Sequence, residues 1–199
     1  MRADVYLHAA GYTQSRKKAQ DLIDAGAVKV DGAVVKKASA EIDHTVPHEV
    51  ELAELYKYVS RGGMKLEAAL DAFAVNVNGK KAVDVGASTG GFTDCLLSRG
   101  ARIVYSIDSG VDQLHPDLRA DDRVVSIEGF NARELDEKIT DGLCQIAVAD
   151  VSFISQTYIL PHVREVLLPG GKAITLIKPQ FEAGRAALNK NGLVKGARD

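Results

Sequence analysis

The spacing of apolar residues divides the chain into a short N-terminal unit and a longer C-terminal unit. In the first 57 residues, two short helical patterns precede a hairpin, which Asp31-Gly32 indicates by lying between two β-branched runs. Ser15 is the expected N-cap of the second helix, and Gly26 is expected to end it. The sequence therefore predicts a small α+β domain over residues 1–57, with residues 41–54 extended along its edge.

The C-terminal unit has a different periodicity. An amphipathic helix is predicted over residues 64–73, where apolar side chains recur at helical spacing. Beyond it, short apolar runs alternate with helical patterns, the clearest at residues 89–99 and 157–168. This alternation predicts a Rossmann-like α/β domain over residues 64–199, with a parallel sheet and a linker at 58–63. The expected strands are residues 82–86, 103–108, 124–127, 146–150 and 173–178.

The composition is typical of a soluble globular protein, with 46% apolar and 26% charged residues among 199. The longest apolar runs have four or five residues, whereas a membrane-spanning helix needs about 20, so no membrane partner is expected. The start of the chain does not resemble a signal peptide. Cys95 and Cys144 lie far apart without CxxC spacing, which predicts neither a disulfide nor a metal site and favours a reduced, cytoplasmic location.

The net charge of −2 argues against binding nucleic acid through bulk electrostatics. Residues 1–40, however, carry seven Lys and Arg against four Asp and Glu, and residues 41–60 carry one against five. A local basic patch can bind phosphate even when the total charge is negative. The same distribution is also compatible with an ordinary solvated surface.

A glycine-rich turn is expected where the first strand of the C-terminal unit meets the next helix, at residues 83–92. Phe92 follows Gly91 directly, which excludes a phosphate-binding P-loop, and Ser88 interrupts a dinucleotide fingerprint. The free amides of residues 88–91 can receive a carboxylate, while Asp84 before the turn suits a cation. Together they fit the amino-acid end of S-adenosylmethionine. The alternative is a tight strand-to-helix turn with an incidental acid.

Three further acidic and basic residues follow the predicted strands. Asp108 ends the second strand 22 residues after Gly86, a spacing at which an acid accepts the ribose hydroxyls of an adenosine ligand. Asp150 and Lys178 end the fourth and fifth strands, and neighbouring strands lie about 4.8 Å apart. We therefore expect these two side chains to share one site, although a surface ion pair is the alternative. Lys65 lies off the apolar face of its helix, where a solvated lysine is the simpler interpretation.

Four segments of the C-terminal unit carry a family resemblance, and they are residues 60–66, 84–94, 150–155 and 178–182. Together they resemble the TlyA (haemolysin A) ribosomal RNA methyltransferases. These enzymes are related to the FtsJ-type methyltransferases. Residues 2–57 resemble the small RNA-binding domain named after ribosomal protein S4, through residues 15–19 and 30–32. The resemblance runs from residue 2 to the end of the chain.

The resemblance implies methylation of cytidine ribose 2′-hydroxyls in ribosomal RNA or ribosomal subunits, with S-adenosylmethionine as the cofactor and no metal. It implies three catalytic residues, with Lys178 as the base, Asp150 as its orienting partner and Lys65 as a second ammonium that favours neutral Lys178. The implied cofactor-binding residues are Asp84, Gly86, Ser88, Thr89, Gly90, Gly91, Phe92 and Asp108. The implied RNA-binding residues are Arg16, Lys17, Lys18 and Arg61.

The chain departs from the family pattern at its C-terminus. The family's fourth catalytic residue, a glutamate, lies on a later strand, and residue 199 precedes it. The last two strands of these methyltransferases are absent as well, so the sequence predicts an uncovered strand edge and raises C-terminal truncation as an expectation. Glu182 belongs to a loop and is not assigned the missing role. The alternative function is an impaired protein that binds RNA and cofactor, whereas membrane-active haemolysin activity is disfavoured.

Overall fold

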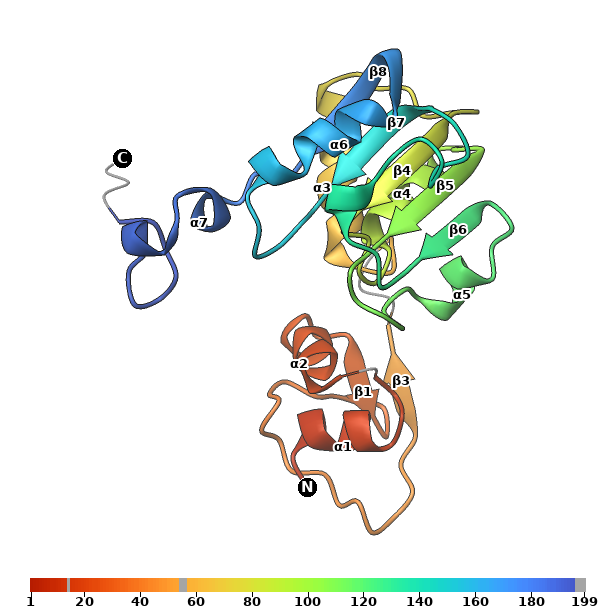
Figure 1. Cartoon of the computed structure of the whole chain (residues 1–199). Coiled ribbons are helices and arrows are strands. Elements are labelled where there is room, and N and C mark those ends of the chain that lie inside the picture. Colours follow the sequence, from red (N-terminus) through yellow and green to blue (C-terminus); the bar gives the residue numbers. More distant parts are fainter. Residues whose placement is uncertain (14, 54–56, 196–199) are drawn as a thin grey trace. The chain divides into compact units, whose positions relative to one another are not determined.

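The computed structural model describes residues 1–13, 15–53 and 57–195. Contacts between residues divide the chain into two units, Met1–Lys57 and Tyr58–Asp199 (Figure 1). Each unit has its own hydrophobic core. The two units are described separately.

The N-terminal unit packs two helices on a three-stranded antiparallel sheet of order β2-β1-β3. The hydroxyl of Ser15 accepts a hydrogen bond from the Lys18 amide at 3.2 Å, which confirms the predicted N-cap. Asp31 and Gly32 have φ values of 51° and 76°, as the predicted hairpin turn requires. The elements are α1 (Ala3–Ala9), α2 (Arg16–Asp24), β1 (Val28–Val30), β2 (Ala33–Val34) and β3 (Val50–Leu52).

The C-terminal unit contains a five-stranded parallel sheet of order β6-β5-β4-β7-β8. The chain places β5 and β6 on one side of β4 and then returns to place β7 and β8 on the other side. This reversal creates a switch point between β4 and β7, and ligands of open α/β sheets bind beyond the carboxyl ends of the strands at such a point. The strands are β4 (Lys81–Val85), β5 (Ile103–Ile107), β6 (Val124–Ile127), β7 (Cys144–Ala149) and β8 (Leu167–Thr175).

Helices and turns cover both faces of this sheet, which confirms the predicted α/β class. One cluster of buried residues joins the sheet to α3 (Arg61–Ala72), α4 (Gly91–Ser98) and α5 (Pro116–Arg119). The other joins the opposite face to α6 (Leu160–Glu165) and the 3₁₀ turn η1 (Ala132–Glu134). Successive side chains of a strand point to opposite faces of the sheet, and accordingly Ala82 belongs to the first cluster, whereas Val83 and Val85 belong to the second. The remaining elements are η2 (Gln156–Tyr158), α7 (Pro179–Glu182) and η3 (Arg185–Ala187).

Residues 58–63, expected to form a linker, pack onto the C-terminal unit instead. Tyr58 is buried in the cluster that covers α3. The α3 helix begins at Arg61, three residues before the predicted start. Its first turn contains two glycines, whose low helix propensity hides the helix from a sequence pattern. Gly63 is required there because a Cβ would overlap the Tyr58 ring.

The last strand and the helix before it are shifted from their predicted positions. The helix expected over residues 157–168 is divided into η2 and α6 and ends at Glu165. The strand expected over residues 173–178 is β8, which begins at Leu167 and ends at Thr175. Lys178 therefore lies three residues beyond the strand, as the residue preceding α7, and does not end it. β8 is the edge strand, as predicted, with β7 as its neighbour in the described sheet.

None of the helices in the part of the chain that the structure describes combines the length and the apolar character needed to cross a membrane.

Candidate active site

The turn between β4 and α4 fits closely against two other segments. Gly86 has φ of 83°, and a Cβ at this position would lie 2.9 Å from the Asp150 carbonyl oxygen. A Cβ at Gly91 would overlap the hydroxyl of Ser60 and lie 3.0 Å from the Gly63 amide nitrogen. Glycine at both positions therefore lets the turn approach the end of β7 and the start of α3 at backbone contact distance.

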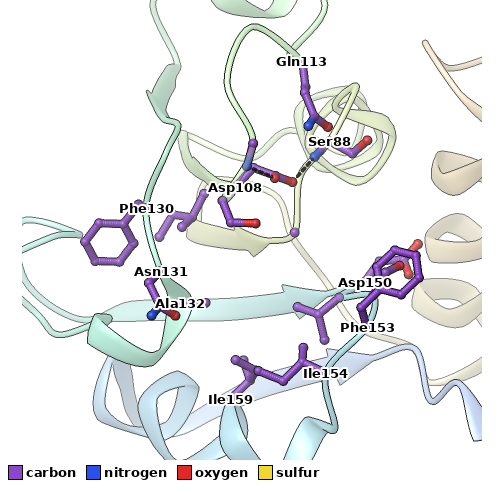
Figure 2. Close-up of a pocket in the computed structure, with 16 residues that line it drawn as sticks. Ser88, Asp108, Gln113, Phe130, Asn131, Ala132, Asp150, Phe153, Ile154 and Ile159 are labelled. Atoms are coloured by element: carbon purple, nitrogen blue, oxygen red, sulfur yellow. Dashed lines mark hydrogen bonds between the residues drawn. The ribbon is translucent and has the colours of Figure 1, made fainter. Parts of the chain in front are cut away.

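A cavity of about 590 Å³ opens beyond the carboxyl ends of β4, β5 and β7 (Figure 2). The Asp108 carboxylate lines this cavity and accepts two backbone hydrogen bonds, from the Ser88 amide at 2.8 Å and the Gly110 amide at 2.7 Å. Each oxygen keeps a second lone pair, so Asp108 can still accept from ligand hydroxyls. The Ser88 amide, expected to receive a ligand carboxylate, instead donates to Asp108.

The loop after β5, which forms one wall of the cavity, is held by Glu128. Its carboxylate accepts from the amides of Asp112 at 3.1 Å, Gln113 at 2.9 Å and Leu114 at 3.1 Å. The Arg119 guanidinium adds an ion pair at 2.9 Å. These donors lower the pKa of Glu128 below its usual range. The loop therefore presents Gln113 to the cavity from a fixed backbone.

A second, smaller cavity of about 210 Å³ contains all three expected catalytic side chains. Lys65 reaches it from α3, Asp150 from the end of β7 and Lys178 from the turn before α7. The two cavities are adjacent because they share wall residues, which are Gly86, Ser88, Asp150 and Ser152. The structure thus brings the predicted lysines and carboxylate together beside the glycine turn.

Lys178 is the best positioned of these side chains. Its ammonium lies 2.7 Å from Asp150 Oδ1 and donates a hydrogen bond to the hydroxyl of Ser152 at 2.7 Å. Both side chains of the ion pair are about one-fifth exposed, so the pair is partly screened from water. Lys65 is exposed and makes no hydrogen bond or ion pair that fixes its ammonium within the described structure. Asp150 and Ser152 therefore hold the ammonium of Lys178 in the small cavity, whereas Lys65 lines that cavity as an exposed side chain.

Asp84 is placed differently from the sequence-based expectation of a side chain facing a ligand cation. Its carboxyl group is fully buried and does not line either cavity. Thr93 Oγ1 donates to Oδ2 at 2.7 Å and also contacts the Ser106 hydroxyl at 2.6 Å, whereas Oδ1 has no hydrogen-bond partner among the described residues. Burial raises the pKa of Asp84 to about 7.

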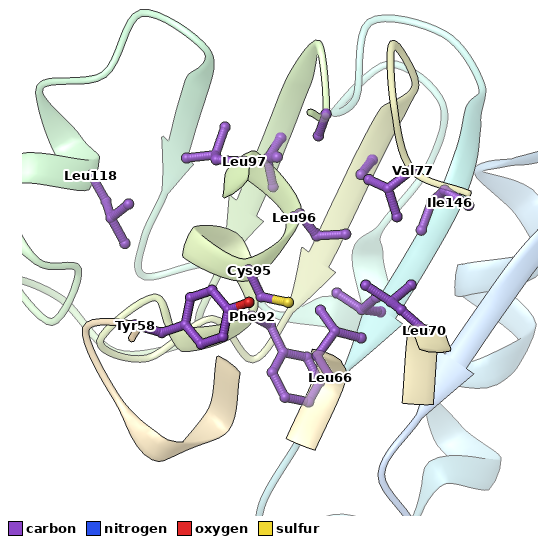
Figure 3. Packing of buried hydrophobic residues seen from close by; sticks show 14 of the residues in the cluster. Tyr58, Leu66, Leu70, Val77, Phe92, Cys95, Leu96, Leu97, Leu118 and Ile146 are labelled. Atoms are coloured by element: carbon purple, nitrogen blue, oxygen red, sulfur yellow. The ribbon is translucent and has the colours of Figure 1, made fainter. Parts of the chain in front are cut away.

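Phe92 and Thr89 also contribute less directly than expected. The Phe92 ring is buried between α3 and α4, in the cluster that includes Leu66 and Tyr58 (Figure 3). Phe92 thus supports the turn from the core while one side of it reaches the smaller cavity. Thr89 is half-buried, and its carbonyl accepts from the His115 amide at 3.2 Å.

The expected RNA-binding residues of the N-terminal unit lie at the start of α2. Arg16 forms an ion pair at 3.0 Å with the buried Asp4, although its side chain remains about half exposed. Lys17 pairs with Asp21 at 2.9 Å, and Lys18 follows on the same exposed turn. In the other unit, Arg61 is exposed at the beginning of α3. Arg16 therefore has a structural partner in addition to any ligand.

Sequence reasoning did not single out several residues of the two cavities. Ser152 lies in the segment 150–155 that carries the family resemblance, and its hydroxyl is the hydrogen-bond partner of Lys178. Phe153 is 91% exposed, has φ of 63° and places its ring 5.1 Å from that of Phe181. An aromatic residue three positions after a strand-ending acid was the available signal. Other cavity residues that were not predicted are Ser109, Gly110, Gln113, Phe130, Asn131, Ala132, Val151, Ile154 and Ile159.

The residues present fit S-adenosylmethionine. Asp108 offers carboxylate oxygens to ribose hydroxyls, and the glycine turn gives close access to backbone atoms. The fold and the two adjacent cavities define a Rossmann-like methyltransferase that depends on S-adenosylmethionine.

Comparison with known proteins agrees with this class. The family model described as "FtsJ-like methyltransferase" matches residues 58–197, and the model described as "S4 domain" matches residues 1–45. The protein named "Hemolysin A" of Brachyspira hyodysenteriae is 48% identical over 98% of this chain and 81% of its own length. The chain therefore belongs to the FtsJ-like methyltransferases of the haemolysin A/TlyA group.

Two further relatives are similar over nearly the whole chain. The "16S/23S rRNA (cytidine-2'-O)-methyltransferase TlyA" of Mycobacterium tuberculosis is 41% identical over 97% of this chain and 72% of its own length. A solved structure described as a hemolysin from Streptococcus thermophilus is 43% identical, with a TM-score of 0.74 over 98% of this chain and 72% of that one. The resemblance stated from the motifs is thus confirmed.

Proposed function

We propose that this chain methylates the 2′-hydroxyl of cytidine ribose in ribosomal RNA, as the name of its Mycobacterium tuberculosis relative states for that protein. The observation that carries the proposal is the shared wall of the two cavities, where Asp150 and Ser152 face both. A ligand in the larger cavity and a hydroxyl in the smaller cavity would meet at this wall, beside the Lys178 ammonium. Alignment of two reactants is what a transfer reaction requires from its enzyme.

The reaction needs a proton acceptor on the substrate side. S-adenosylmethionine supplies an electrophilic methyl group when bound, whereas a ribose hydroxyl is a weak nucleophile. We assign removal of the hydroxyl proton to Lys178 Nζ, which Asp150 and Ser152 hold at the shared wall. Nζ can accept this proton only through the lone pair of the neutral amine. Lys65 lines the same small cavity and adds a second cationic side chain beside the reacting hydroxyl.

The substrate side also offers an aromatic surface. Enzymes that modify a nucleotide stack its base on aromatic side chains after removing it from a helix. The Phe153 ring is nearly fully exposed and follows Asp150 by three residues. We propose that it receives a base while the ribose occupies the smaller cavity.

The N-terminal unit provides the RNA-docking part of the proposal. Its α2 helix begins with Arg16, Lys17 and Lys18, of which the first two side chains are more than half exposed. Such positive groups bind phosphates without reading the base sequence. We therefore propose that residues 16–18 and Arg61 anchor ribosomal RNA, while the catalytic cavities select the nucleotide.

The test compares methyl transfer with cofactor binding in one pair of variants. Lys178→Ala is expected to reduce transfer of tritiated methyl groups to unmodified ribosomal subunits by roughly 10²–10⁴-fold. Its affinity for S-adenosylmethionine, measured by calorimetry, should change less than threefold, because Lys178 lines only the smaller cavity. Lys172→Ala is the control, since Lys172 is an exposed lysine of β8 that lines neither cavity.

Two results would contradict the proposal. Cofactor binding by the parent chain without transfer to any ribosomal RNA would refute the activity. Undiminished transfer by Lys178→Ala would refute the assignment of the base. Mapping the product by resistance to alkaline cleavage identifies the methylated ribose, because a 2′-O-methyl group blocks cleavage at that position.

A further inference from the structure

Glu182, at the end of α7, connects the two loops that carry the catalytic side chains. We propose that it is a positioning residue for Lys178, an inference that rests on the proposed function for its kinetic consequences. One loop follows β7 and contains Asp150 and Ser152. The other follows β8 and contains Lys178. Neither loop belongs to the ladder of the sheet, so other contacts must set the distance between them.

The Glu182 carboxylate joins these loops through both of its oxygens. Oε2 accepts from the hydroxyl of Ser155 at 2.6 Å, and Oε1 accepts from the Gln156 amide at 3.0 Å. These two donors lower the pKa of Glu182 below its usual range, which keeps it ionised at neutral pH. Hydrogen bonds to a charged acceptor are shorter and stronger than those between neutral groups.

A second connection lies on the other side of Lys178. The Gln156 side chain is buried and donates from Nε2 to the Leu176 carbonyl at 2.9 Å. The chain is therefore hydrogen-bonded to Gln156 on both sides of Lys178. Leu176, before Lys178, accepts from the Gln156 side chain, and Glu182, after Lys178, accepts from the Gln156 amide. Between them its ammonium reaches Ser152 and Asp150. The chain around Lys178 thus has little freedom to move relative to the β7 loop.

The strained backbone of the β7 loop is consistent with this role. Phe153 has φ of 63°, a conformation that costs about 1–3 kcal/mol and persists only where neighbouring contacts hold it. The ring of Phe153 lies 5.1 Å from that of Phe181, the residue before Glu182. Loss of the Glu182 contacts would let both loops relax and separate Lys178 from Asp150.

Glu182 is not a substitute for the glutamate that the family places on a later strand. It lines neither cavity, and both of its oxygens accept hydrogen bonds from the β7 loop. A carboxylate engaged in this way orients other groups and does not reach the ribose. Its effect on the reaction must pass through the position of Lys178.

The experiment is a double-mutant cycle on Glu182 and Ser155. We expect Glu182→Ala to lower kcat for ribosomal subunit methylation by roughly 10–100-fold, the range found when a reacting group is displaced by about 1 Å. Affinity for S-adenosylmethionine should change less than threefold. Ser155→Ala should have a smaller effect on kcat, because the bond from the Gln156 amide to Glu182 remains. The double variant should be no slower than Glu182→Ala, because the bond from Ser155 to Glu182 is already lost there. Glu182→Gln keeps an acceptor and should recover most of the loss.

The control is Glu137→Ala, which removes an exposed glutamate whose side chain has no partner among the described residues. A readout that needs no activity accompanies the kinetics. In the parent and in Glu137→Ala, the ring protons of Phe153 and Phe181 should give a nuclear Overhauser contact, as expected for centroids 5.1 Å apart. Glu182→Ala should lose this contact while keeping the melting temperature of the parent within a few degrees.

The outcomes separate this inference from the proposed function. If the parent transfers no methyl group, loss of the ring contact in Glu182→Ala still supports the anchoring role, and its retention overturns it. If the parent is active, a kcat within twofold of the parent overturns the inference. Additive effects of the two substitutions, or equal losses in kcat and cofactor affinity, also overturn it, because they indicate general destabilisation.

Discussion

The buried Asp84 gives the most demanding test of the site as a physical structure. Its carboxyl group is fully buried, one oxygen has no partner among the described residues, and its pKa is raised to about 7. Asp150 and Asp108 add to this increase by like-charge repulsion. Asp84→Asn removes the charge and keeps the shape, so the comparison measures the cost of ionising this position.

The direction of the effect follows from proton binding in the two states. Below about pH 4 the carboxyl group is protonated in both the folded and the unfolded chain, and it contributes nothing to the pH dependence. Between pH 4 and pH 7 the unfolded chain releases this proton and the folded chain keeps it. The contribution of Asp84 to the free energy of unfolding therefore falls as the pH rises through this interval, and it is constant above it.

The magnitude follows from the difference between the two pKa values. Each pKa unit corresponds to about 1.4 kcal/mol, so the raised pKa of Asp84 lowers the stability of the folded chain by roughly 4 kcal/mol at pH 8 and by roughly 1–2 kcal/mol at pH 5. The asparagine side chain leaves its own donor unpaired, at a cost of about 1–3 kcal/mol, but that cost is the same at both pH values. The stability of Asp84→Asn relative to the parent should thus improve by roughly 2–3 kcal/mol from pH 5 to pH 8.

The assay is urea unfolding followed by far-UV circular dichroism, since the chain has no tryptophan. The N-terminal unit is identical in both proteins, so differences report on the unit that contains Asp84. Asp122→Asn, at an exposed aspartate, is the matched control and should show no such difference. Equal differences between Asp84→Asn and the parent at pH 5 and pH 8 would refute the reasoning.

Three other substitutions test separate parts of the structure. Glu128→Gln should weaken S-adenosylmethionine binding by roughly 10-fold in calorimetry, because the neutral side chain holds the amides of the β5 loop less tightly. Gly91→Ala should destabilise the C-terminal unit by about 1–3 kcal/mol in urea titrations, and Ser60→Ala should restore part of this loss by removing the overlapping hydroxyl. Asp4→Asn should destabilise the N-terminal unit by roughly 2 kcal/mol above pH 5, because it weakens the buried acceptor shared by Arg2, Arg16 and Gln20. Because these donors lower the pKa of Asp4, the parent should lose this stability as the pH falls below about 4, which thermal melts at pH 3 and pH 7 would show.

The sequence predicted most of the fold because its elements differ in periodicity and punctuation. The hairpin at Asp31-Gly32 and the cap at Ser15 depend on contacts within a few residues, which a sequence displays directly. Four of the five parallel strands were located within two residues at each end, because buried parallel strands are short continuous apolar runs. In these regions local preference and tertiary structure favour the same conformation.

The errors occurred where tertiary contacts override local preference. Residues 61–63 form a helical turn although two are glycines, because that turn packs against Tyr58 and the β4–α4 turn. β8 begins at Leu167 because its early residues pair with Cys144 before a register shift. An apolar run such as residues 166–168 is compatible with a helix or a strand, and only the neighbouring strand decides between them.

The candidate site shows the same division between local and distant information. Asp150 and Lys178 were placed together because the carboxyl ends of neighbouring parallel strands lie side by side. Lys178 reaches that position from beyond the strand, and its place depends on contacts between residues 26 or more apart, through Glu182 and Ser152. The spacing of apolar residues along the sequence carries no information about contacts between such distant residues.

Lys65 shows why the motif and the physical pattern had to be used together. On its helix it has the features of a solvated lysine, since it lies off the apolar face and is exposed. It becomes part of the site because Gly91 lets α4 approach the first turn of α3 at backbone distance, and that end of α3 lines the small cavity. Gly62 and Gly63, which weaken the helical signal, lie at this contact, and Lys65 then lines the same cavity as Asp150. A larger residue at position 91 should separate the two helices and reduce methyl transfer more than it reduces cofactor affinity, which links the packing of α3 to the chemistry at the shared wall.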